Sequence, residues 1–261
     1  MLPISVFIIT KNEEDRIEKI IKAVKNFADE ILIIDSGSTD KTLEKSQALG
    51  AQTYFNEWNG YGQQKIFGEE KCRNNWILNI DADEEVSPEL SQEIIEIFKQ
   101  KIAENVAGFK IKIVNKFRFE ERPKKLAYFY NQFRLYRKDV AGFKNSTVHD
   151  SVELKSAEKY QILQLKNIIF HQSFRSFSHW IEKINSYSSM QAQDAFNKGK
   201  CPSYLKVFLA PTFGFLKAFI VRRYFIYGLD GIIYSYIFAL SRFAKAIKTR
   251  EFFKANSLKN K

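Results

Sequence analysis

The sequence predicts an α/β fold, with a mixed sheet flanked by helices and a helical appendage at its C-terminal end. Three observations lead to this fold class. In the first hundred residues, short apolar runs alternate with segments in which apolar residues recur at helical spacing. Polar stretches rich in carboxylates follow several of these apolar runs. After about residue 203, long apolar and aromatic runs broken by basic residues replace the alternation.

The apolar runs are expected to be strands of one sheet. Residues 4–10 form a continuous β-branched run, which is typical of a parallel strand buried on both faces. Shorter runs of the same kind follow at residues 30–35, 51–55 and 76–80. Two further runs, 107–114 and 132–136, suit antiparallel strands added to the sheet.

Helices are expected between the strands and beyond them. Ser87 and Pro88 suit an N-cap and a first helical position, so a helix should begin there. The other expected helices cover residues 17–24, 38–50, 65–74 and 177–197.

Charge is divided unevenly along the chain, which carries +11 in total. Residues 1–100 hold 11 Lys and Arg against 19 Asp and Glu, a net charge of −8. Residues 101–261 hold 30 against 11, a net charge of +19. An acidic front suits a cation site, and a basic, aromatic back suits an anionic surface such as lipid or a phosphorylated glycan. Because no recognised nucleic-acid module is present, we expect no nucleic acid partner.

Cysteine usage and the N-terminus bear on the cellular compartment. Cys72 and Cys201 have no metal-type spacing and give no disulfide framework. Met1 to Pro3 lead directly into an apolar run, without the basic segment or cleavage site of a signal peptide. We therefore expect a cytoplasmic catalytic part, peripheral on the inner face of the cell membrane.

The strongest chemical signal is the pair of carboxylates in Asp81-Ala82-Asp83, directly after an expected strand. Strands of a parallel sheet deliver the residues that follow them to one edge, where ligands bind. Two neighbouring carboxylates repel each other unless a cation lies between them. Mg²⁺ or Mn²⁺ would fit and would leave positions open for phosphate oxygens.

Two more polar stretches follow strands, Thr10-Lys11-Asn12-Glu13 and Asp35-Ser36-Gly37-Ser38-Thr39-Asp40. Asp35 could accept a hydrogen bond from the N–H of a uracil-type base. The alternative is an ordinary loop in which Ser38 or Asp40 caps the next helix.

Taken together, these stretches resemble the family 2 glycosyltransferases, which have the GT-A fold. The shared pattern is T-x-N-E, then D-x-G-S-x-D, then D-x-D, separated by about 25 and about 45 residues. The segment 60–65, Val148-His149-Asp150 and His171 extend the likeness to the bacterial lipopolysaccharide-core glucosyltransferase subgroup. The likeness covers nearly the whole chain and weakens after about residue 200.

This resemblance implies an inverting transfer of a sugar, with glucose from UDP-glucose as the expected donor, to a lipopolysaccharide-core or related glycolipid or phosphorylated glycan. Asp150 would be the catalytic base, and Asp83 with His171 would bind the metal, although His171 could instead be a buried residue at a strand end. The residues implied for the nucleotide and donor are Thr10, Asn12, Glu13, Asp35, Ser36, Lys65, Asp81, Ala82 and Asp83.

Three further residues carry weaker expectations. His149 could position the base or contact the acceptor, or it could be a structural hydrogen-bonding residue. Arg134 and Arg137 could bind phosphates of the donor or acceptor. A solvated basic face is the alternative for both arginines.

The expected organisation is a glycosyltransferase domain at residues 1–200 and a basic, aromatic tail at 201–261. No stretch clearly meets the length of about 20 apolar residues for a spanning helix, and residues 224–241 come closest. The tail helices would lie in a membrane interface or pack on the main domain. Two rival functions share these features: a polyprenyl-phosphate glycosyltransferase, and a non-catalytic protein that binds an anionic surface.

Overall fold

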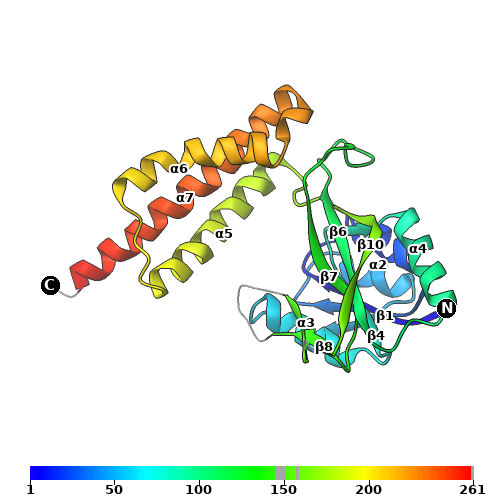
Figure 1. Ribbon diagram of the computed structural model, residues 1–261. Coiled ribbons are helices and arrows are strands. Elements are labelled where there is room, and N and C mark those ends of the chain that lie inside the picture. The colour runs from blue at the N-terminus through cyan, green and yellow to red at the C-terminus, as the bar shows by residue number, and fades with distance from the viewer. Residues whose placement is uncertain (145–150, 157–158, 260–261) are drawn as a thin grey trace. The chain divides into compact units, whose positions relative to one another are not determined.

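The computed structural model describes residues 1–144, 151–156 and 159–259 (Figure 1). The chain divides into two compact units. The first comprises Met1–Val114 and Phe129–His171 and is called the sheet unit below. The second comprises Asn115–Tyr128 and Gln172–Lys261 and is called the helical unit.

An eight-stranded sheet forms the centre of the sheet unit, in the order β3-β2-β1-β4-β7-β6-β10-β5. β3, β2, β1 and β4 are parallel, whereas β7 is antiparallel to both β4 and β6, and β5 is antiparallel to β10. β8 and β9 pair separately as an antiparallel ribbon. The predicted mixed α/β sheet is therefore confirmed. The strand bounds are β1 Leu2–Thr10, β2 Ala28–Asp35, β3 Gln52–Phe55, β4 Trp76–Asp81, β5 Glu84–Val86, β6 Val106–Asn115, β7 Phe129–Arg137, β8 Ala141–Phe143, β9 Val152–Leu154 and β10 Gln161–His171.

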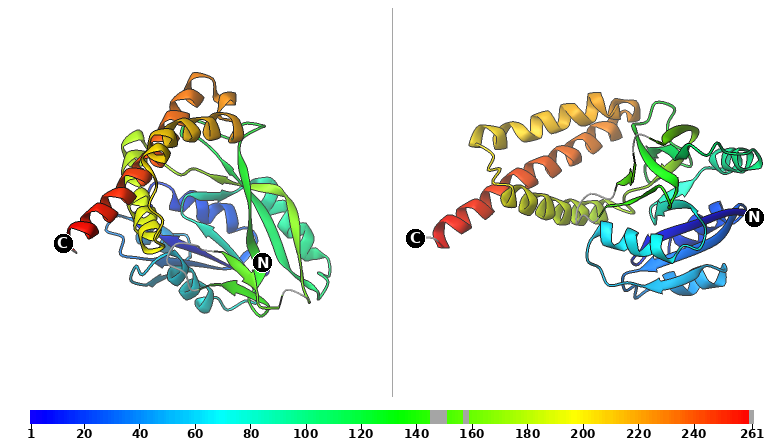
Figure 2. Two further views of the ribbon diagram at one scale, coloured as in Figure 1. Left: turned by 60° about the vertical axis from the view of Figure 1, so that its left-hand side comes forward. Right: turned by 60° about the horizontal axis from the view of Figure 1, so that its bottom comes forward.

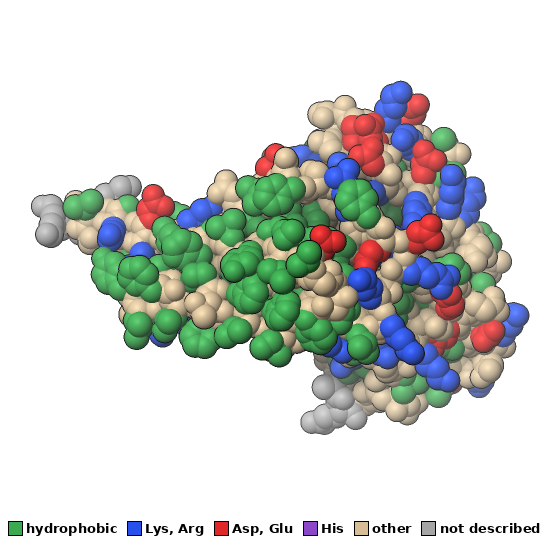
Figure 3. Space-filling model, turned by 90° about the horizontal axis from the view of Figure 1, so that it is seen from above, with side chains coloured by type: hydrophobic (Ala, Val, Ile, Leu, Met, Phe, Trp, Pro, Cys, Tyr) green, Lys and Arg blue, Asp and Glu red, His purple; other side chains and the backbone are tan. Residues whose placement is uncertain are grey.

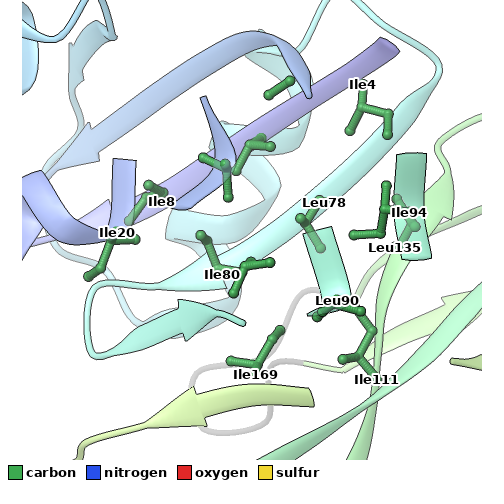
Figure 4. Packing of buried hydrophobic residues seen from close by; sticks show 14 of the residues in the cluster. Ile4, Ile8, Ile20, Leu78, Ile80, Leu90, Ile94, Ile111, Leu135 and Ile169 are labelled. Carbon is green, nitrogen blue, oxygen red and sulfur yellow. The ribbon is translucent and has the colours of Figure 1, made fainter. Parts of the chain in front are cut away.

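Side chains alternate between two apolar clusters on opposite faces of this sheet. From β1, Ile4 and Ile8 enter one cluster and Phe7 enters the other, as the two-residue period of a strand requires. Leu90 and Ile94, from the helix Pro88–Lys99, pack in the first cluster (Figure 4). The helices of this unit are α1 Ile17–Val24, α2 Thr42–Ala48, α3 Tyr61–Lys71 and α4 Pro88–Lys99.

Local signals in the sequence explain where some elements begin, but several details differ from expectation. α3 spans Tyr61–Lys71 and not 65–74, and β8 and β9 were not predicted. The Ser87 hydroxyl accepts from the Leu90 N–H at 3.1 Å, so the predicted cap of α4 is present. α2 begins at Thr42 and not at residue 38, because side-chain hydrogen bonds hold residues 36–40 as a loop. β5 was not predicted, and its pairing with β10 draws the acidic stretch after β4 into the sheet.

The helical unit is built around aromatic rings. Phe117 stacks on Tyr234 with 4.0 Å between ring centroids and meets Tyr227 edge-on at 4.7 Å. Phe174 stacks on Trp180 at 3.7 Å. The helices are α5 Phe177–Asn197, α6 Tyr204–Leu216, the π-helical turn η1 Lys217–Val221, the 3₁₀ turn η2 Tyr224–Tyr227 and α7 Leu229–Lys259.

α5 belongs with this unit because it packs against α7, as α6 also does (Figure 2). The structural division thus falls at Gln172 and takes in Asn115–Tyr128, where we had expected a boundary near residue 200. The loop between β6 and β7 joins the helices because Phe117 is the centre of their aromatic cluster.

Among the described residues, one helical segment is long and apolar enough to cross a membrane, Tyr204–Val221. Our choice of residues 224–241 as the nearest candidate was wrong. That stretch is divided between η2 and α7 at Gly228, which takes a positive φ angle of 61°. Pro211, by contrast, lies inside α6 without ending it.

Candidate active site

The carboxyl ends of β1, β2 and β4 meet at one edge of the sheet and bring the predicted motifs together. Thr10 is the register partner of Asp35, and Ile9 is the partner of Asp81. Parallel pairing produces this alignment, because all three strands run in the same direction and end at the same edge.

Asp35 holds the loop that follows β2. Its Oδ2 accepts from the N–H groups of Gly37 and Ser38, both at 2.8 Å. Its Oδ1 accepts from the hydroxyls of Ser38 at 2.5 Å and Thr10 at 3.2 Å. These four bonds occupy the roughly four acceptor sites of a carboxylate. In this conformation Asp35 therefore shapes the loop, and a base N–H would have to displace one of these donors.

Hydrogen bonds between side-chain and backbone groups join the loops after β1 and β2. The Asn12 N–H donates to the Ser38 hydroxyl at 2.8 Å, and the Thr39 N–H donates to the Asn12 side-chain oxygen at 2.8 Å. Asn12 has a φ of 56°, a conformation that asparagine tolerates better than most residues. Asn12 thus links the loop after β1 to the loop after β2.

Three other residues of these motifs take structural contacts. The Glu13 N–H donates to the Thr42 hydroxyl at 2.7 Å, and the Glu13 carboxylate pairs with Arg16 at 2.8 Å. The Ser36 hydroxyl donates to the Thr10 carbonyl at 3.2 Å. Asp40 accepts from the Thr42 N–H at 3.0 Å, but it lies one residue before Lys41, which is the N-cap of α2, so neither Ser38 nor Asp40 occupies the N-cap position.

Next to these loops, two buried cations and two carboxylates form a network. Lys65 Nζ lies 2.8 Å from Asp81 Oδ1, and the Lys65 side chain is completely buried. Arg134 Nη2 lies 3.0 Å from Asp81 Oδ2 and 2.8 Å from Glu84 Oε1. Its Nη1 donates to the Asn79 side-chain oxygen at 2.6 Å. Arg134 therefore holds the end of β4 and the start of β5 together.

Burial and charge act differently on the two carboxylates. Burial alone would raise the pKa of Asp81, but the charges of Lys65 and Arg134 outweigh it and lower the pKa to about 2. Burial raises the pKa of Glu84 to about 7, because the charge of Arg134 offsets it only in part and Asp81 is a like charge. Asp81 is thus held ionised while Glu84 holds a proton more readily.

Asp83 and His171 approach each other at the rim of this network. Asp83 Oδ2 lies 3.4 Å from His171 Nε2, and both side chains are about one-sixth exposed, at 16% and 17%. Neighbouring ligands of an octahedral ion with bonds of about 2.1 Å lie about 3 Å apart. The pair therefore fits two neighbouring positions on a divalent ion. No third His, Cys, Asp or Glu completes a cluster within the described part of the chain, so phosphate oxygens and water would have to fill the other positions.

Not every predicted residue reaches this edge. Arg137 lies beside Trp76 at the opposite end of β4 and pairs with Asp139 at 2.6 Å. Arg134 is buried and paired with carboxylates, so the alternative of a solvated basic face does not hold for Arg134. Phosphate binding by Arg134 or Arg137 stays a prediction. His149 and Asp150 lie outside the described residues, between β8 and β9.

Sequence reasoning missed Glu84 and Asn79, which are 1% and 0% exposed and both bound to Arg134. Four acidic residues, Asp81, Asp83, Glu84 and Glu85, lie within five positions at the end of β4, and nothing in their order marks Glu84 as buried. Asn79 did carry a signal, because it is the one polar residue inside an otherwise apolar strand.

Known glycosyltransferases are similar to this chain in sequence. The chain is 44% identical over 253 residues to an uncharacterized glycosyltransferase of Rickettsia bellii, covering 95% of this chain and 86% of the relative. It is 28% identical to the lipopolysaccharide core biosynthesis glycosyltransferase LpsC of Rhizobium meliloti, covering 95% and 92%. A solved structure of glucosyl-3-phosphoglycerate synthase from Mycobacterium tuberculosis, with Mn²⁺ and UDP-glucose, matches 45% of this chain and 44% of that chain at 22% identity. Its TM-score of 0.35 is too low to support a conclusion.

The family profile described as Glycosyl transferase family 2 matches residues 5–160. This span is more than half of the chain and contains the three loop motifs, the buried ion network and Asp83. The chain belongs to the family 2 glycosyltransferases.

Proposed function

We propose that this protein is an inverting, metal-dependent hexosyltransferase that takes glucose from UDP-glucose. The observation that carries the proposal is the approach of Asp83 to His171 at 3.4 Å, beside the Lys65–Asp81 ion pair. The proposed acceptor is a lipopolysaccharide core or a related cell-envelope glycan. Its support is the 28% identity to LpsC across nearly all of both chains.

In this proposal the loops after β1 and β2 bind the nucleotide. Thr10, Asn12 and Asp35 would present it at the sheet edge. Lys65 and Arg134 hold Asp81 ionised and in place. Asp81, together with Asp83, would hold the donor diphosphate through the divalent ion, which separates the two negative charges. Asp83 and His171 would hold a divalent ion, which when bound offsets the negative charge of the departing diphosphate. The imidazole favours Mn²⁺ over Mg²⁺, since Mg²⁺ prefers oxygen ligands.

The acceptor hydroxyl needs a base because a neutral alcohol is a weak nucleophile. We propose Asp150 for this role, with His149 beside it. Asp150 would take the hydroxyl proton as the oxygen attacks the anomeric carbon opposite the diphosphate, and this attack inverts the anomeric centre. An α-linked donor would then give a β-linked product.

A polyprenyl phosphate is the second candidate acceptor. The observation that favours it is the apolar, poorly buried segment Tyr204–Val221 in the same chain. Supplying purified protein with UDP-glucose and either acceptor separates the two, because only one should accumulate labelled sugar.

The first test measures binding of UDP with and without Mn²⁺ or Mg²⁺. Wild-type protein should bind UDP only with the ion, and more tightly with Mn²⁺. Asp83→Ala should lose the metal-dependent binding of UDP, and its turnover should be lower by at least about a hundredfold. Asp139→Ala is the matched control, because Asp139 pairs with Arg137 at the far end of β4. Metal-dependent UDP binding that survives in Asp83→Ala would rule out this metal site.

The second test separates donor binding from chemistry. Asp150→Asn should bind UDP as the wild type does and lose transfer by about a hundredfold or more, since a general base typically contributes that much. Full activity of Asp150→Asn would assign the base elsewhere. Glu153 on β9 would then be tested as the base. Its carboxylate forms an ion pair with Lys144, the residue that follows β8.

A further inference from the structure

One face of the helical unit is covered by large apolar side chains (Figure 3). On α6, Phe208 and Phe213 are 73% and 63% exposed, and on η1 Ile220 is 58% exposed. On α7, Ile233 and Tyr236 are 53% and 66% exposed. The exposed residues Leu205, Leu209, Phe213 and Leu216 recur on α6 at spacings of four, four and three residues, and Phe208 follows Leu205 by three. Residues at such spacings, like Ile233 and Tyr236 on α7, lie on one side of a helix. Scattered exposed apolar residues are ordinary, but a continuous helical face of them indicates an interaction site.

The inward side of α6 and η1 carries small residues. Val207 and Gly214 on α6 and Ala218 on η1 are the buried residues of this segment. A Cβ on Gly214 would lie 3.0 Å from the Ala239 Cα, so α6 and α7 pack with their backbones close together. The larger apolar side chains point outward, which is the reverse of the pattern in a helix that packs on a water-facing domain.

Charge distinguishes between the partners that could cover this face. The helical unit holds 20 Lys and Arg against 6 Asp and Glu, a net charge of +14, whereas the sheet unit has 21 against 24, a net charge of −3. A second copy would bring another charge of +14 against the first. An anionic lipid surface supplies both an apolar phase and the opposite charge.

We propose that the face formed by α6, η1 and the first half of α7 docks on an anionic lipid bilayer and lies in its interface without crossing it. The reason against crossing is Arg242. If α6 spanned the bilayer, Gly214 would lie near the middle, and the Arg242 side chain is 3.2 Å from a Cβ built at Gly214. A cation at that depth is costly, whereas at the interface it meets headgroups.

The test measures flotation of the full chain with phosphatidylcholine vesicles that contain or lack phosphatidylglycerol, at low and high salt. The protein should bind the anionic vesicles, and salt should weaken binding because the headgroup attraction is screened. Phe208→Asp and Phe213→Asp should each weaken it about tenfold or more. Phe55→Asp is the matched control, because Phe55 is 70% exposed but lies on β3 of the sheet unit. Alkaline carbonate should release the bound protein, as it does interfacial proteins.

Several results would overturn the inference. Equal loss in Phe55→Asp, or no loss in the two α6 variants with unchanged circular dichroism, would remove the role of this face. Resistance to carbonate would mean that the segment crosses the bilayer. A lipid-free dimer that Phe208→Asp dissociates, without vesicle binding by the wild type, would identify a second copy as the occupant. Docking does not depend on the proposed transfer reaction, since no nucleotide is present in this measurement.

Discussion

The two units of this chain treat charge and apolar surface in opposite ways. The sheet unit buries Lys65, Arg134 and Glu84 in a network of ion pairs, and its net charge is −3. The helical unit has an aromatic interior, but it also exposes large apolar side chains on one face, and its net charge is +14. Buried ions persist only when they are paired, and exposed apolar faces persist only when something covers them.

This difference shows that the two units distribute charge in different ways. The ions of the sheet unit are fixed by hydrogen bonds among themselves, which is the fixed geometry that the proposed phosphate site needs. The helical unit has too few carboxylates to pair its cations internally. Its charge therefore remains available to a partner, and the predictions below test whether each unit behaves in its own way.

The largest effect is expected from Arg134→Met. Removing the guanidinium leaves Glu84 buried without its ion-pair partner and deprives Asp81 of one of two cations. The free energy of unfolding should fall by about 3–5 kcal/mol. Urea unfolding followed by circular dichroism measures this change.

Arg137→Met is the matched control for that variant. Arg137 lies on the same strand, but its ion pair with Asp139 is partly exposed, and such pairs contribute about 1 kcal/mol or less. Similar losses of unfolding free energy in both variants would show that burial of its ion pairs does not determine how much Arg134 stabilises the sheet unit.

The sequence predicted the sheet and the edge at which the site forms, because apolar runs define strands and parallel strands align their ends. It could not separate Arg134 from Arg137. The two differ by three positions on β7, and only the register with β4 places one beside Asn79 and the other beside Trp76. Such pairing between distant segments leaves no local mark in the sequence.

The tail shows a second kind of limit. Composition favoured residues 224–241 because charges are few there, but the backbone turn at Gly228 divides that stretch. In Tyr204–Val221, Lys206 and Lys217 suggested interruption, yet both lie near the ends of the segment. Which side of α6 faces outward depends on its packing against α7, and periodicity alone does not supply that information.

An intermediate effect is expected from Phe117→Ala. Phe117 is 4% exposed and contacts several rings of the helical unit, so its truncation should cost about 3 kcal/mol there. Hydrogen exchange read by mass spectrometry should show faster exchange in η2 and α7, with β1 and β4 unchanged. Phe119→Ala in the same loop is the control, because Phe119 is 87% exposed. Loss of protection in both units together would mean that they unfold as one body, and the comparison would fail.

The smallest effect concerns Glu69, a partly buried carboxylate on α3 that accepts from the Phe143 N–H at 3.0 Å and the Tyr136 hydroxyl at 3.3 Å. Burial raises the pKa of Glu69, and these two hydrogen bonds offset the rise only in part. A raised folded-state pKa stabilises the fold below the unfolded pKa, and this contribution is lost as pH rises through the folded value.

Glu69→Gln removes that titration and keeps an acceptor for the Phe143 N–H. As pH rises from 4 to 7, the free energy of unfolding of the variant should therefore increase relative to that of the wild type. The increase should be less than about 1 kcal/mol because the side chain is partly solvated. Chemical denaturation at several pH values measures the increase, and Glu70→Gln at the exposed neighbouring position is the control. A change in the opposite direction would mean that Glu69 is stabilised as the anion. The interior of the sheet unit would then favour charge even where no cation is in direct contact, and its contrast with the helical unit would be sharper.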